Sequence, residues 1–346
     1  MRSSLLRPAV ALIASFVVAC GGAPPVAAPS APPSTAATAT KAPVVKLAVS
    51  FSNIISDELP LWIAKEGGYF DKNSLDVELS NIASTQGVAA LLSGQVKFAQ
   101  MGGSESLSAA AQGADVKVVG MIAGVYPFVL EVNASIKTIA DLKGKKIGVS
   151  AVGSSSDIAT RVALRKMGLD ADKDVTISAV GSVQQRTAAM LTGAIDAGLA
   201  QPPDTIALEE KGYHVLYDLA AQKLPSANTA VVVQGSYLSQ NKDVVQRYVD
   251  SLTQAIVRER NDKPFSLTVL QKYLKIDDQK ALNAAYDFYS KSVVPLTPEV
   301  RTDHFVDSVI TLGATNEKVK TFDLAKLIDN SFVQDAVKRG LDKTDK

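Results

Sequence analysis

The stretch QGVAALLSGQVKFA, residues 86–99, returns about a hundred positions later as QRTAAMLTGAIDAG, residues 185–198. Gly94 and Gly193 occupy the same place in both copies, where a helix that leads into a strand favours a left-handed residue. Three further pairs of segments follow the same order at shifts of 98 to 100 positions: VVKLAVS and KKIGVSA, LWIAKEGGYF and RVALRKMGLD, LDVELSNIAS and KDVTISAVGS. Four matches in one order indicate an internal duplication.

Each copy alternates apolar strand patterns with helical ones, which predicts right-handed parallel βαβ units and two similar α/β lobes. In open α/β sheets, ligands bind outside the carboxyl ends of the strands. The duplication therefore predicts one cleft between the two lobes, surrounded by four loops. These loops are residues 50–53, 101–105, 150–157 and 200–204.

The chain changes character after Gly235, where helical patterns replace the strand–helix alternation. We expect these helices to pack back onto the first lobe. One of them is predicted to begin with Thr297 as its cap and Pro298 at its first position, because proline suits the first turn of a helix.

The N-terminus resembles a bacterial lipoprotein signal. Arg2 and Arg7 precede the apolar run PAVALIASFVVA, residues 8–19, and Cys20 follows at the expected cleavage point. We expect residues 1–19 to be a signal peptide and Cys20 to be lipidated, which would anchor the protein to a membrane surface. The alternative is an ordinary secretory signal with a chance cysteine. Residues 20–43 are rich in proline and alanine and read as a tether.

Composition excludes several classes of function. The chain has 346 residues, 47% of them hydrophobic, and a formal net charge of +1, so no basic excess points to nucleic acid. A single cysteine permits no intrachain disulfide, and the two histidines, His214 and His304, lie far apart in the sequence. We therefore expect neither a metal site nor a cofactor.

Four segments together resemble the solute-binding proteins of bacterial ABC importers, in the nitrate, sulfonate and taurine group that also includes binders of thiamine precursors. They are LPLWIAKEGGYFDKNSLDVEL, ALLSGQVKFAQMGG, IADLKGKKIGVSAVGSSSD and AMLTGAIDAGLAQPPD. The resemblance covers residues 44–338. It implies a type II periplasmic-binding-protein-like fold, with two α/β lobes around a ligand cleft joined by two crossing strands. It also implies a monomer that closes by hinge motion on a small molecule and delivers it to a membrane permease with its ATPase.

On this basis we place the first lobe at residues 44–127 plus 229–346 and the second at residues 128–228. The crossings are expected near residues 126–133 and 227–232, where extended apolar stretches would link the lobes. The protein would be exported and would act on the outer side of a bacterial membrane.

Ser154, Ser155 and Ser156 begin a predicted helix whose free N–H groups favour an anion, although one of these serines could merely cap the helix. Asp157 suits the first turn and stands four residues before Arg161, the spacing of a helical ion pair. In the first lobe the corresponding loop offers two glycines, a hydroxyl and a carboxylate that would cap the helix or bind ligand. Its residues are Gly102, Gly103, Ser104 and Glu105.

Further candidates lie at strand ends and at the predicted hinge. Ser52 and Asn53 end the first strand and could reach the cleft or make a turn. Tyr126 is a candidate aromatic lid, and Trp62 is expected in the core. Gln201 and Asp204 lie where relatives often have an aromatic and an acidic residue. No loop contains Lys or Arg, so the ligand is left open between a small anion held by amides and hydroxyls, a carboxylate and a neutral heterocycle.

Two other functions compete with an importer component. Some relatives with this fold make a pyrimidine precursor with histidine and cysteine-rich sites, but neither histidine lies in a predicted cleft loop. We therefore expect a binding protein and not an enzyme. A receptor that presents its liganded form to a sensor would use the same cleft, and the sequence does not separate it from an importer component.

Overall fold

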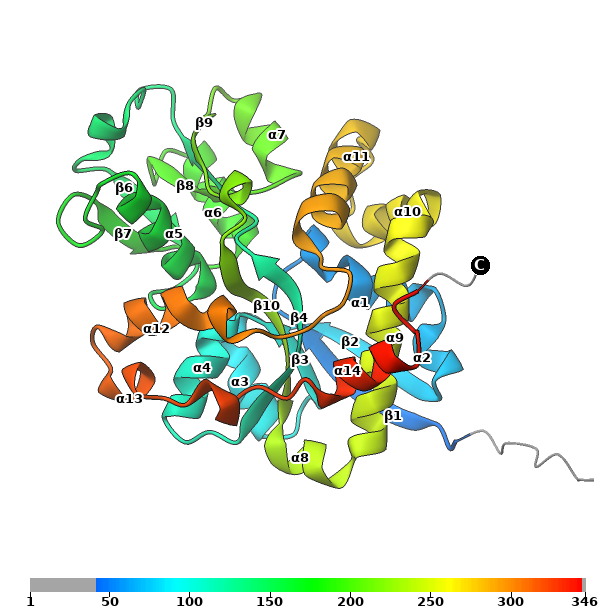
Figure 1. Ribbon diagram of the computed structural model, residues 1–346. Helices are drawn as coiled ribbons and strands as arrows, with labels where there is room; N and C mark the ends of the chain where they lie inside the picture. Colours follow the sequence, from blue (N-terminus) through cyan, green and yellow to red (C-terminus); the bar gives the residue numbers. More distant parts are fainter. Residues whose placement is uncertain (1–41, 344–346) are drawn as a thin grey trace, which may run out of the picture. The chain divides into compact units, whose positions relative to one another are not determined.

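The computed structural model describes residues 42–343. The predicted signal peptide, the lipidated Cys20 and almost all of the tether lie outside these residues. Two mixed sheets of five strands each form the framework, and helices cover both (Figure 1). The predicted fold, two α/β lobes joined by crossing segments, is confirmed.

The first sheet has the strand order β2-β1-β3-β10-β4. Strand β1 pairs in parallel with β2 and β3, and β10 runs antiparallel to both β3 and β4. The strands are β1 (Val45–Phe51), β2 (Leu75–Asn81), β3 (Phe98–Met101), β4 (Val116–Val125) and β10 (Pro225–Gln234).

The second sheet has the order β7-β6-β8-β5-β9 and the same pattern of directions. Strand β6 is parallel to β7 and β8, and β5 is antiparallel to β8 and β9. The strands are β5 (Val129–Val132), β6 (Lys146–Val149), β7 (Thr176–Ala179), β8 (Ala197–Ala200) and β9 (His214–Asp218).

The two sheets confirm the duplication, but the second strands of the two copies align two residues away from the match made on the sequence. Leu47 of β1 lies opposite Val77 of β2, and Ile147 of β6 lies opposite Ile177 of β7. The sequence comparison had matched Val77 with Val175, two positions earlier. Because side chains alternate along a strand, a shift of two residues leaves the same face inward, and the pattern alone does not reveal it.

Helices follow the strands as the βαβ pattern predicts. We call the first sheet with its helices the first lobe and the second sheet with its helices the second lobe. The first-lobe helices before β4 are α1 (Leu59–Glu66), α2 (Tyr69–Lys72), α3 (Ser84–Leu92) and α4 (Gly103–Ala111), and η1 (Ser56–Glu58) precedes α1. The second-lobe helices are α5 (Ser155–Lys166), α6 (Val183–Leu191) and α7 (Asp204–Glu209).

Two short segments connect the sheets. Residues 126–128 lead from β4 to β5, and residues 219–224 lead from β9 back to β10. The sequence had placed the second crossing at residues 227–232, but these lie within β10 and pair with β3 and β4. A segment that crosses between the lobes and a buried central strand are both extended and apolar. The sequence pattern therefore did not distinguish one from the other.

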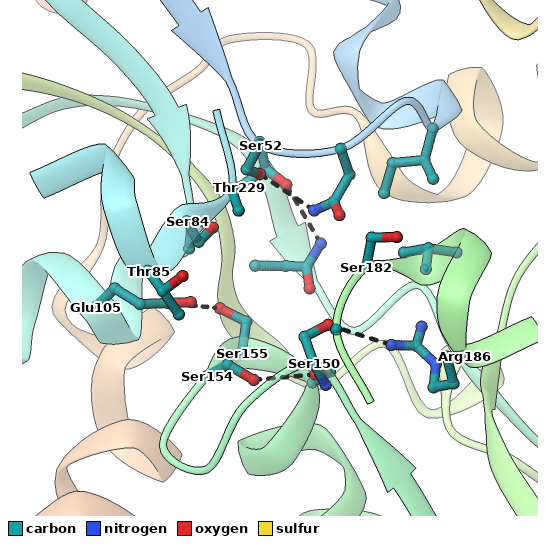
Figure 2. Close-up of a pocket in the computed structure, with 18 of the residues that line it drawn as sticks. Ser52, Ser84, Thr85, Glu105, Ser150, Ser154, Ser155, Ser182, Arg186 and Thr229 are labelled. Carbon is teal, nitrogen blue, oxygen red and sulfur yellow. Dashed lines mark hydrogen bonds between the residues drawn. The ribbon is translucent and has the colours of Figure 1, made fainter. Parts of the chain in front are cut away.

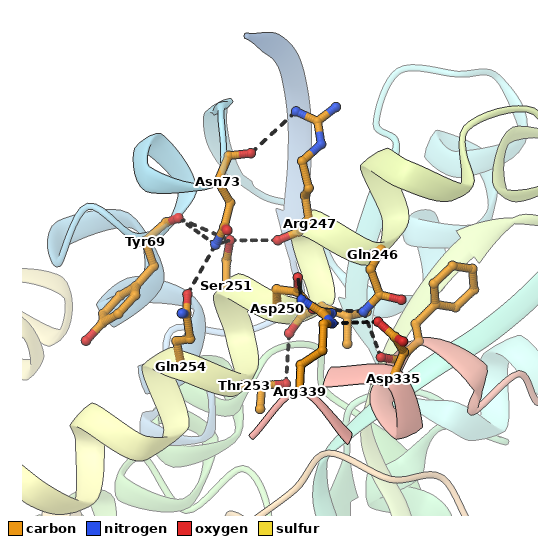
Figure 3. Close-up of polar contacts among 12 residues, drawn as sticks. Tyr69, Asn73, Gln246, Arg247, Asp250, Ser251, Thr253, Gln254, Asp335 and Arg339 are labelled. Carbon is orange, nitrogen blue, oxygen red and sulfur yellow. Dashed lines mark hydrogen bonds and ion pairs between the residues drawn. The ribbon is translucent and has the colours of Figure 1, made fainter. Parts of the chain in front are cut away.

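The C-terminal helices are α8 (Gly235–Gln240), α9 (Lys242–Asn261), α10 (Lys263–Leu274), α11 (Gln279–Phe288), α12 (Val306–Gly313), α13 (Glu317–Lys320) and α14 (Ser331–Lys338). Helix α9 is fixed on both sides by polar contacts (Figure 3). Asn73 after α2 donates to Ser251 Oγ at 2.9 Å, and Arg339 after α14 holds Asp250 of α9. These contacts tie the chain's end to the first lobe.

The helix predicted to begin at Thr297 and Pro298 starts later, at η5 (Thr302–Phe305) and α12. Residues before it stay extended along β4 because their backbone groups bond elsewhere. The Pro298 carbonyl accepts from Met121 N at 2.8 Å, and Val300 exchanges two hydrogen bonds with the Asn330 side chain.

Each sheet has its own apolar core. Trp62 of α1, fully buried as predicted, stacks on Tyr273 of α10 and packs with the apolar face of β1. In the second lobe, Ile158 and Val162 of α5 pack on Ile147 and Leu199 of the sheet. Within residues 42–343, no helix combines the length and apolarity that a bilayer span requires.

Candidate functional site

A cavity of about 200 Å³ lies between the carboxyl ends of the parallel strands of the two lobes (Figure 2). This is smaller than the pockets of about 300–1,000 Å³ that hold drug-sized ligands, so a compact ligand fits best. Hydroxyl and amide side chains dominate its wall. The polar residues that line it are Ser52, Asn53, Asp57, Ser84, Thr85, Glu105, Ser150, Ser154, Ser155, Ser156, Ser182, Gln185, Arg186, Asn228 and Thr229.

Four helices begin at this cavity. Two belong to the first lobe, where Ser84 of α3 and Gly102 before α4 line the wall, and two belong to the second, where Ser155 of α5 and Val183 of α6 do so. The first N–H groups of a helix have no partner within it, and the helix dipole places positive potential there. Four such ends at one cavity favour a negatively charged group in its interior.

Among the described residues that line the cavity, Arg186 is the one with a cationic side chain. It lies in the first turn of α6 and is 1% exposed. Its Nε donates to the Leu199 carbonyl at 2.7 Å and its Nη1 to Ser150 Oγ at 3.3 Å. Nη2 has no partner among the described residues. A buried guanidinium with an unused donor suits an anion, since leaving such a donor unpaired costs free energy.

Burial lowers the pKa of Arg186 to about 10, while the nearby carboxylate of Asp204 acts in the opposite direction. The guanidinium therefore stays protonated at neutral pH. Burial likewise raises the pKa of Asp204, and Arg186 opposes that rise. No ion pair joins the two side chains in the described part of the chain, so the charge of Arg186 remains available to the cavity.

Asp57 faces the cavity from the first lobe, in the short helix η1. Its Oδ2 accepts hydrogen bonds from Thr229 Oγ1 and Asn228 Nδ2 of β10, and its Oδ1 has no partner among the described residues. Burial raises the pKa of Asp57 to about 6, and the Thr229 hydrogen bond partly offsets that rise.

Glu105 joins the two lobes at one side of the cavity (Figure 2). Its Oε2 accepts from Ser104 Oγ at 2.7 Å and from Ser155 Oγ of α5 at 3.5 Å. Burial raises its pKa, and the hydrogen bond from Ser104 opposes the rise. A Cβ on Gly102 would fall 2.1 Å from Glu105 Oε2 and 2.5 Å from Ser155 Oγ, so a larger residue there would displace the side chains through which the lobes meet.

The structure brings seven of the predicted site residues to the cavity wall. Ser154 also caps α5, accepting from Asp157 N, and Ser156 Oγ accepts from Ser150 N at 2.8 Å. The predicted ion pair between Asp157 and Arg161 is present at 3.0 Å. The seven residues are Ser52, Asn53, Gly102, Glu105, Ser154, Ser155 and Ser156.

Five predicted residues do not line the cavity. Gly103 packs against Ala227 of β10, and Ser104 is buried behind Glu105. Tyr126, expected as a lid, is 2% exposed in the second-lobe core and donates to Asp307 Oδ2 at 3.1 Å. Gln201 is buried, and Asp204 begins α7. Their loop leads into α7 instead of along the cavity.

Sequence reasoning missed Asp57, Arg186 and the polar residues of β10, Asn228 and Thr229. It considered the ends of only two strands in each lobe and left out the ends of β2 and β7, where α3 and α6 begin. The duplication contained a signal for Arg186, because the matching position in the first copy is Gly87. A charged residue at a position where the first copy has glycine marks a difference between the copies that side-chain chemistry could explain.

Comparison of the sequence with known proteins identifies the family to which the chain belongs. The family model described as NMT1/THI5 like matches residues 55–259. A protein of Brucella abortus (strain 2308), which bears the provisional name of a binding protein, is 26% identical over 272 residues. The match covers 75% of this chain and 82% of that protein.

Solved structures share the fold. The periplasmic aliphatic sulphonate binding protein SsuA from Escherichia coli matches with a TM-score of 0.65 and 23% identity, covering 82% of this chain and 92% of that one. The periplasmic nitrate-binding protein NrtA from Synechocystis PCC 6803 matches with a TM-score of 0.68 and 14% identity, covering 86% and 89%. The family match spans more than half of the chain and includes both lobes. The chain belongs to the NMT1/THI5 like family.

Proposed function

We propose that this protein is the substrate-binding component of an ABC-type importer, which captures a small anion in the cavity between its lobes and delivers it to a membrane permease. Family membership and the likeness to sulfonate- and nitrate-binding proteins support this function. The ligands of those proteins do not identify the ligand of this one. The argument for an anion therefore rests on the side chains and helix ends of this cavity.

The observation that carries the proposal is the combination of four helix N-termini with the buried guanidinium of Arg186 at one cavity. Each feature favours negative charge, and together they provide backbone N–H donors, hydroxyl donors and one full positive charge. A ligand with oxygen acceptors would satisfy Nη2 of Arg186, which has no partner in the described residues.

Contacts between the lobes support capture by closure. Ser104 and Ser155 hydroxyls lie 3.2 Å apart, and Gln184 of α6 donates to the Ile54 carbonyl of the first lobe at 3.1 Å. Arg165 of α5 pairs with Asp307 of α12 at 2.6 Å. A ligand that contacts both lobes favours this closed arrangement over an open one by its differential affinity.

The proposal includes export and lipid anchoring through Cys20, which rest on the sequence because residues 1–41 lie outside the described part. Anchoring would keep the binding protein near its permease. Intact-mass measurement of the membrane-extracted protein tests it. A mature chain that starts at Cys20 and carries acyl mass is expected, and an unmodified Cys20 would contradict it.

The ligand is tested by thermal shift and calorimetry of the full chain against nitrate, ethanesulfonate, propionate, a pyrimidine and a flavin. We expect at least one anion to raise the unfolding temperature, since saturation at about 100 times Kd stabilises a protein by about 2.7 kcal/mol. Arg186→Gln should abolish that shift. Shifts from the heterocycles alone, unaffected by Arg186→Gln, would contradict an anion site.

A sensor receptor would bind its ligand in the same way, so delivery needs its own test. Uptake of the labelled ligand into vesicles that contain the cognate permease and ATPase should depend on added binding protein. Binding without any such uptake would favour the receptor alternative.

A further inference from the structure

The two copies of the duplicated unit surround one shared acidic residue differently. In the second copy, Asp157 pairs with Arg161 at 3.0 Å, so its negative charge is compensated within its own lobe. The matching positions of the first copy hold Asp57 and Leu61, and both side chains are buried. Asp57 therefore lacks the cation that its counterpart has, although it is only 1% exposed. Burial without a cation makes the charged form of a carboxyl group costly.

The hydrogen bonds of Asp57 compensate only part of this cost. Its Oδ2 accepts from two uncharged side chains of β10, Thr229 and Asn228, and its Oδ1 has no partner among the described residues. The next residue, Glu58, is equally buried, and its Oε2 has no partner there either. Two adjacent buried carboxyl groups repel each other when both are ionised, so the pair holds a proton more readily than an acid in water does.

The two carboxyl groups of this pair carry different charges at neutral pH. Burial, together with the charge of Asp57, raises the pKa of Glu58 well above its usual range, so Glu58 keeps its proton. Burial raises the pKa of Asp57 only to about 6, because hydrogen bonds, above all that from Thr229, oppose the rise. At neutral pH the empty cavity therefore faces an ionised Asp57, which a nearby negative charge would protonate.

An anion in the cavity supplies that negative charge. Asp57 lines the same cavity of about 200 Å³, so the carboxylate and the anion would lie close together. Resting on the proposed anion-binding function, we propose that the cavity takes up its anion together with one proton, which Asp57 holds while the anion is bound. Protonation removes the repulsion between the two groups. It also turns the carboxylate, which only accepts hydrogen bonds, into a donor.

The charged groups across the cavity do not make this proton unnecessary. Arg186 faces the cavity from the second lobe, opposite Thr229 (Figure 2), and its hydrogen bonds go to partners other than Asp57. A bound anion would compensate the charge of Arg186. Glu105 on the cavity wall and Asp204 near Arg186 are acids, so neither supplies a cation.

The described elements around η1 supply no other cation to Asp57. In η4 (Tyr289–Val293), which packs against η1, Tyr289 stays neutral because burial, with a contribution from Asp57, raises the pKa of its hydroxyl well above the usual range. Lys291 of the same segment is exposed and pairs with another acid. Strand β10 has no charged residue and the first six residues of α1 are apolar. Lys117, the one charged residue of β4, lies at the end of the strand away from the hinge.

The proposal predicts how the affinity depends on pH. At pH 7 an acid with a pKa of about 6 holds about a tenth of a proton. A negative charge about 5 Å away, at an effective dielectric constant of about 20, would raise that pKa to about 8, so about 0.8 proton is taken up on binding. The affinity should therefore be highest below about pH 6, fall by up to about tenfold per pH unit between about pH 6 and 8, and level off above that range.

Calorimetry of the full chain with nitrate, ethanesulfonate and propionate counts the protons. Each of these anions is ionised at pH 7, so a proton that is taken up goes to the protein. The heat of binding in bis-Tris, imidazole and Tris buffers, at one chloride concentration, should vary with the ionisation enthalpy of the buffer, with a slope that corresponds to about 0.8 proton taken up. Anion binding without proton uptake would overturn the proposal and leave the anion site intact.

Variants then locate the proton. Asp57→Asn keeps the size of the side chain but removes the charge that the proton neutralises. It should abolish the uptake and bind the anion with an affinity that is constant between pH 6 and 8, and at pH 8 about tenfold or more tighter than the unmodified protein does. Thr229→Val removes the hydrogen bond that favours ionised Asp57. It should therefore lower the uptake at pH 7, which gives a second readout if Asp57→Asn folds poorly.

Two further acids serve as controls. Asp157→Asn changes the matched acid of the second copy, which lies outside the cavity lining, and should leave the uptake unchanged. Glu105→Gln should retain most of it. Uptake that persists in Asp57→Asn and disappears in Glu105→Gln would overturn the assignment to Asp57. No binding of any of the three anions would instead remove the proposed function on which this inference rests.

Discussion

The two lobes share a strand order and a helix pattern but present opposite charges to the cavity between them. The first lobe contributes Asp57 and Glu105, and the second contributes Arg186. Positions that shape the fold are kept in both copies, as with Gly94 and Gly193, which adopt left-handed conformations at φ of 75° and 72°. The copies differ at cavity-lining positions such as Arg186, whose counterpart in the first copy is Gly87. The two lobes thus present walls of similar backbone and different side-chain charge.

A second difference concerns helix capping at the cavity. Helix α6 has a capping box in which the Ser182 and Gln185 side chains exchange hydrogen bonds with the backbone. Helix α3 begins after Ala83 and has no side-chain cap. Free N–H groups at α3 are therefore left for water or ligand, whereas those of α6 are partly used.

The largest expected effect comes from removing the second lobe's charge. Arg186→Gln should weaken anion binding by about a hundredfold or more, because a buried charged partner of an anion contributes about 2–5 kcal/mol when truncated. Calorimetry with the tightest anion of the panel measures the loss. Arg186→Lys keeps the charge and should retain part of the affinity.

Arg301→Gln is the matched control, since Arg301 pairs with exposed Asp303 away from the cavity. Its affinity should equal that of the unmodified protein. Undiminished binding by folded Arg186→Gln would show that the helix N-termini alone hold the anion, and the charge contrast between the lobes would lose its functional meaning.

The next effect is the pH dependence of stability, which should be dominated by the first lobe. Burial raises the pKa of Glu259 in α9 to about 8 and that of Glu131 in β5 to about 7. The folded protein then binds more protons than the unfolded chain, so the free energy of unfolding falls as pH rises towards these values. His304, whose pKa burial lowers to about 4, acts oppositely only below its ordinary value of 6.5.

Between about pH 6.5 and 8 the free energy of unfolding should therefore fall by about 1.4 kcal/mol per pH unit for each such acid that is still protonated. Urea unfolding at these pH values measures the slope. Glu259→Gln should flatten it more than Glu131→Gln does. Stability that rises over this interval would contradict the predicted protonation of both carboxyl groups.

A smaller effect, on the free energy of unfolding, is expected when Asp157 of the second lobe loses its cation and so resembles Asp57 of the first lobe. Arg161→Leu leaves Asp157, which is 1% exposed, without its cation and should cost about 1–3 kcal/mol of stability. Chemical denaturation provides the measurement. Arg301→Leu, which breaks an exposed pair, should cost less than about 1 kcal/mol. Equal costs for the two variants would argue against a structural role for the Asp157 pair.

The smallest effect tests the capping difference. Ser182→Ala removes the α6 cap and should lower the free energy of unfolding by about 1 kcal/mol. Ala83→Ser places a capping residue three positions before Gln86, as in the second copy, and should raise stability by up to about 1 kcal/mol. Thermal unfolding without ligand measures both, and a stabilising Ser182→Ala would refute the assigned cap.

The sequence predicted the lobes, the alternation of strands and helices in each repeat and the general place of the cavity, because these follow from the period of apolar residues and from one duplication. It also predicted the serines that begin α5. It did not predict Asp57, because that residue lies in η1, six residues after the end of β1, in a loop–helix segment whose path no pattern defines. Arg186 was missed because only the helix that follows each first and third strand was considered.

Three residues were predicted to line the cavity but do not, because the tertiary path of the chain directs them elsewhere. Tyr126 looked like a lid because it lies at the hinge, but its ring packs inward and its hydroxyl bonds to Asp307 of α12, which is 181 positions away in sequence. Gln201 and Asp204 lie at a strand end, yet the turn that follows leads them into α7. Long-range packing of this kind leaves no local trace in the sequence.

The central claim is that the cavity holds an anionic group between Arg186 and the helix N-termini. A crystal structure of the protein with the tightest anion of the panel tests it most directly. We predict that the anion contacts Nη2 of Arg186 and at least one serine of α5, with the lobes closed around it. An anion bound outside this cavity, or one inside it that does not touch Arg186, would contradict the account.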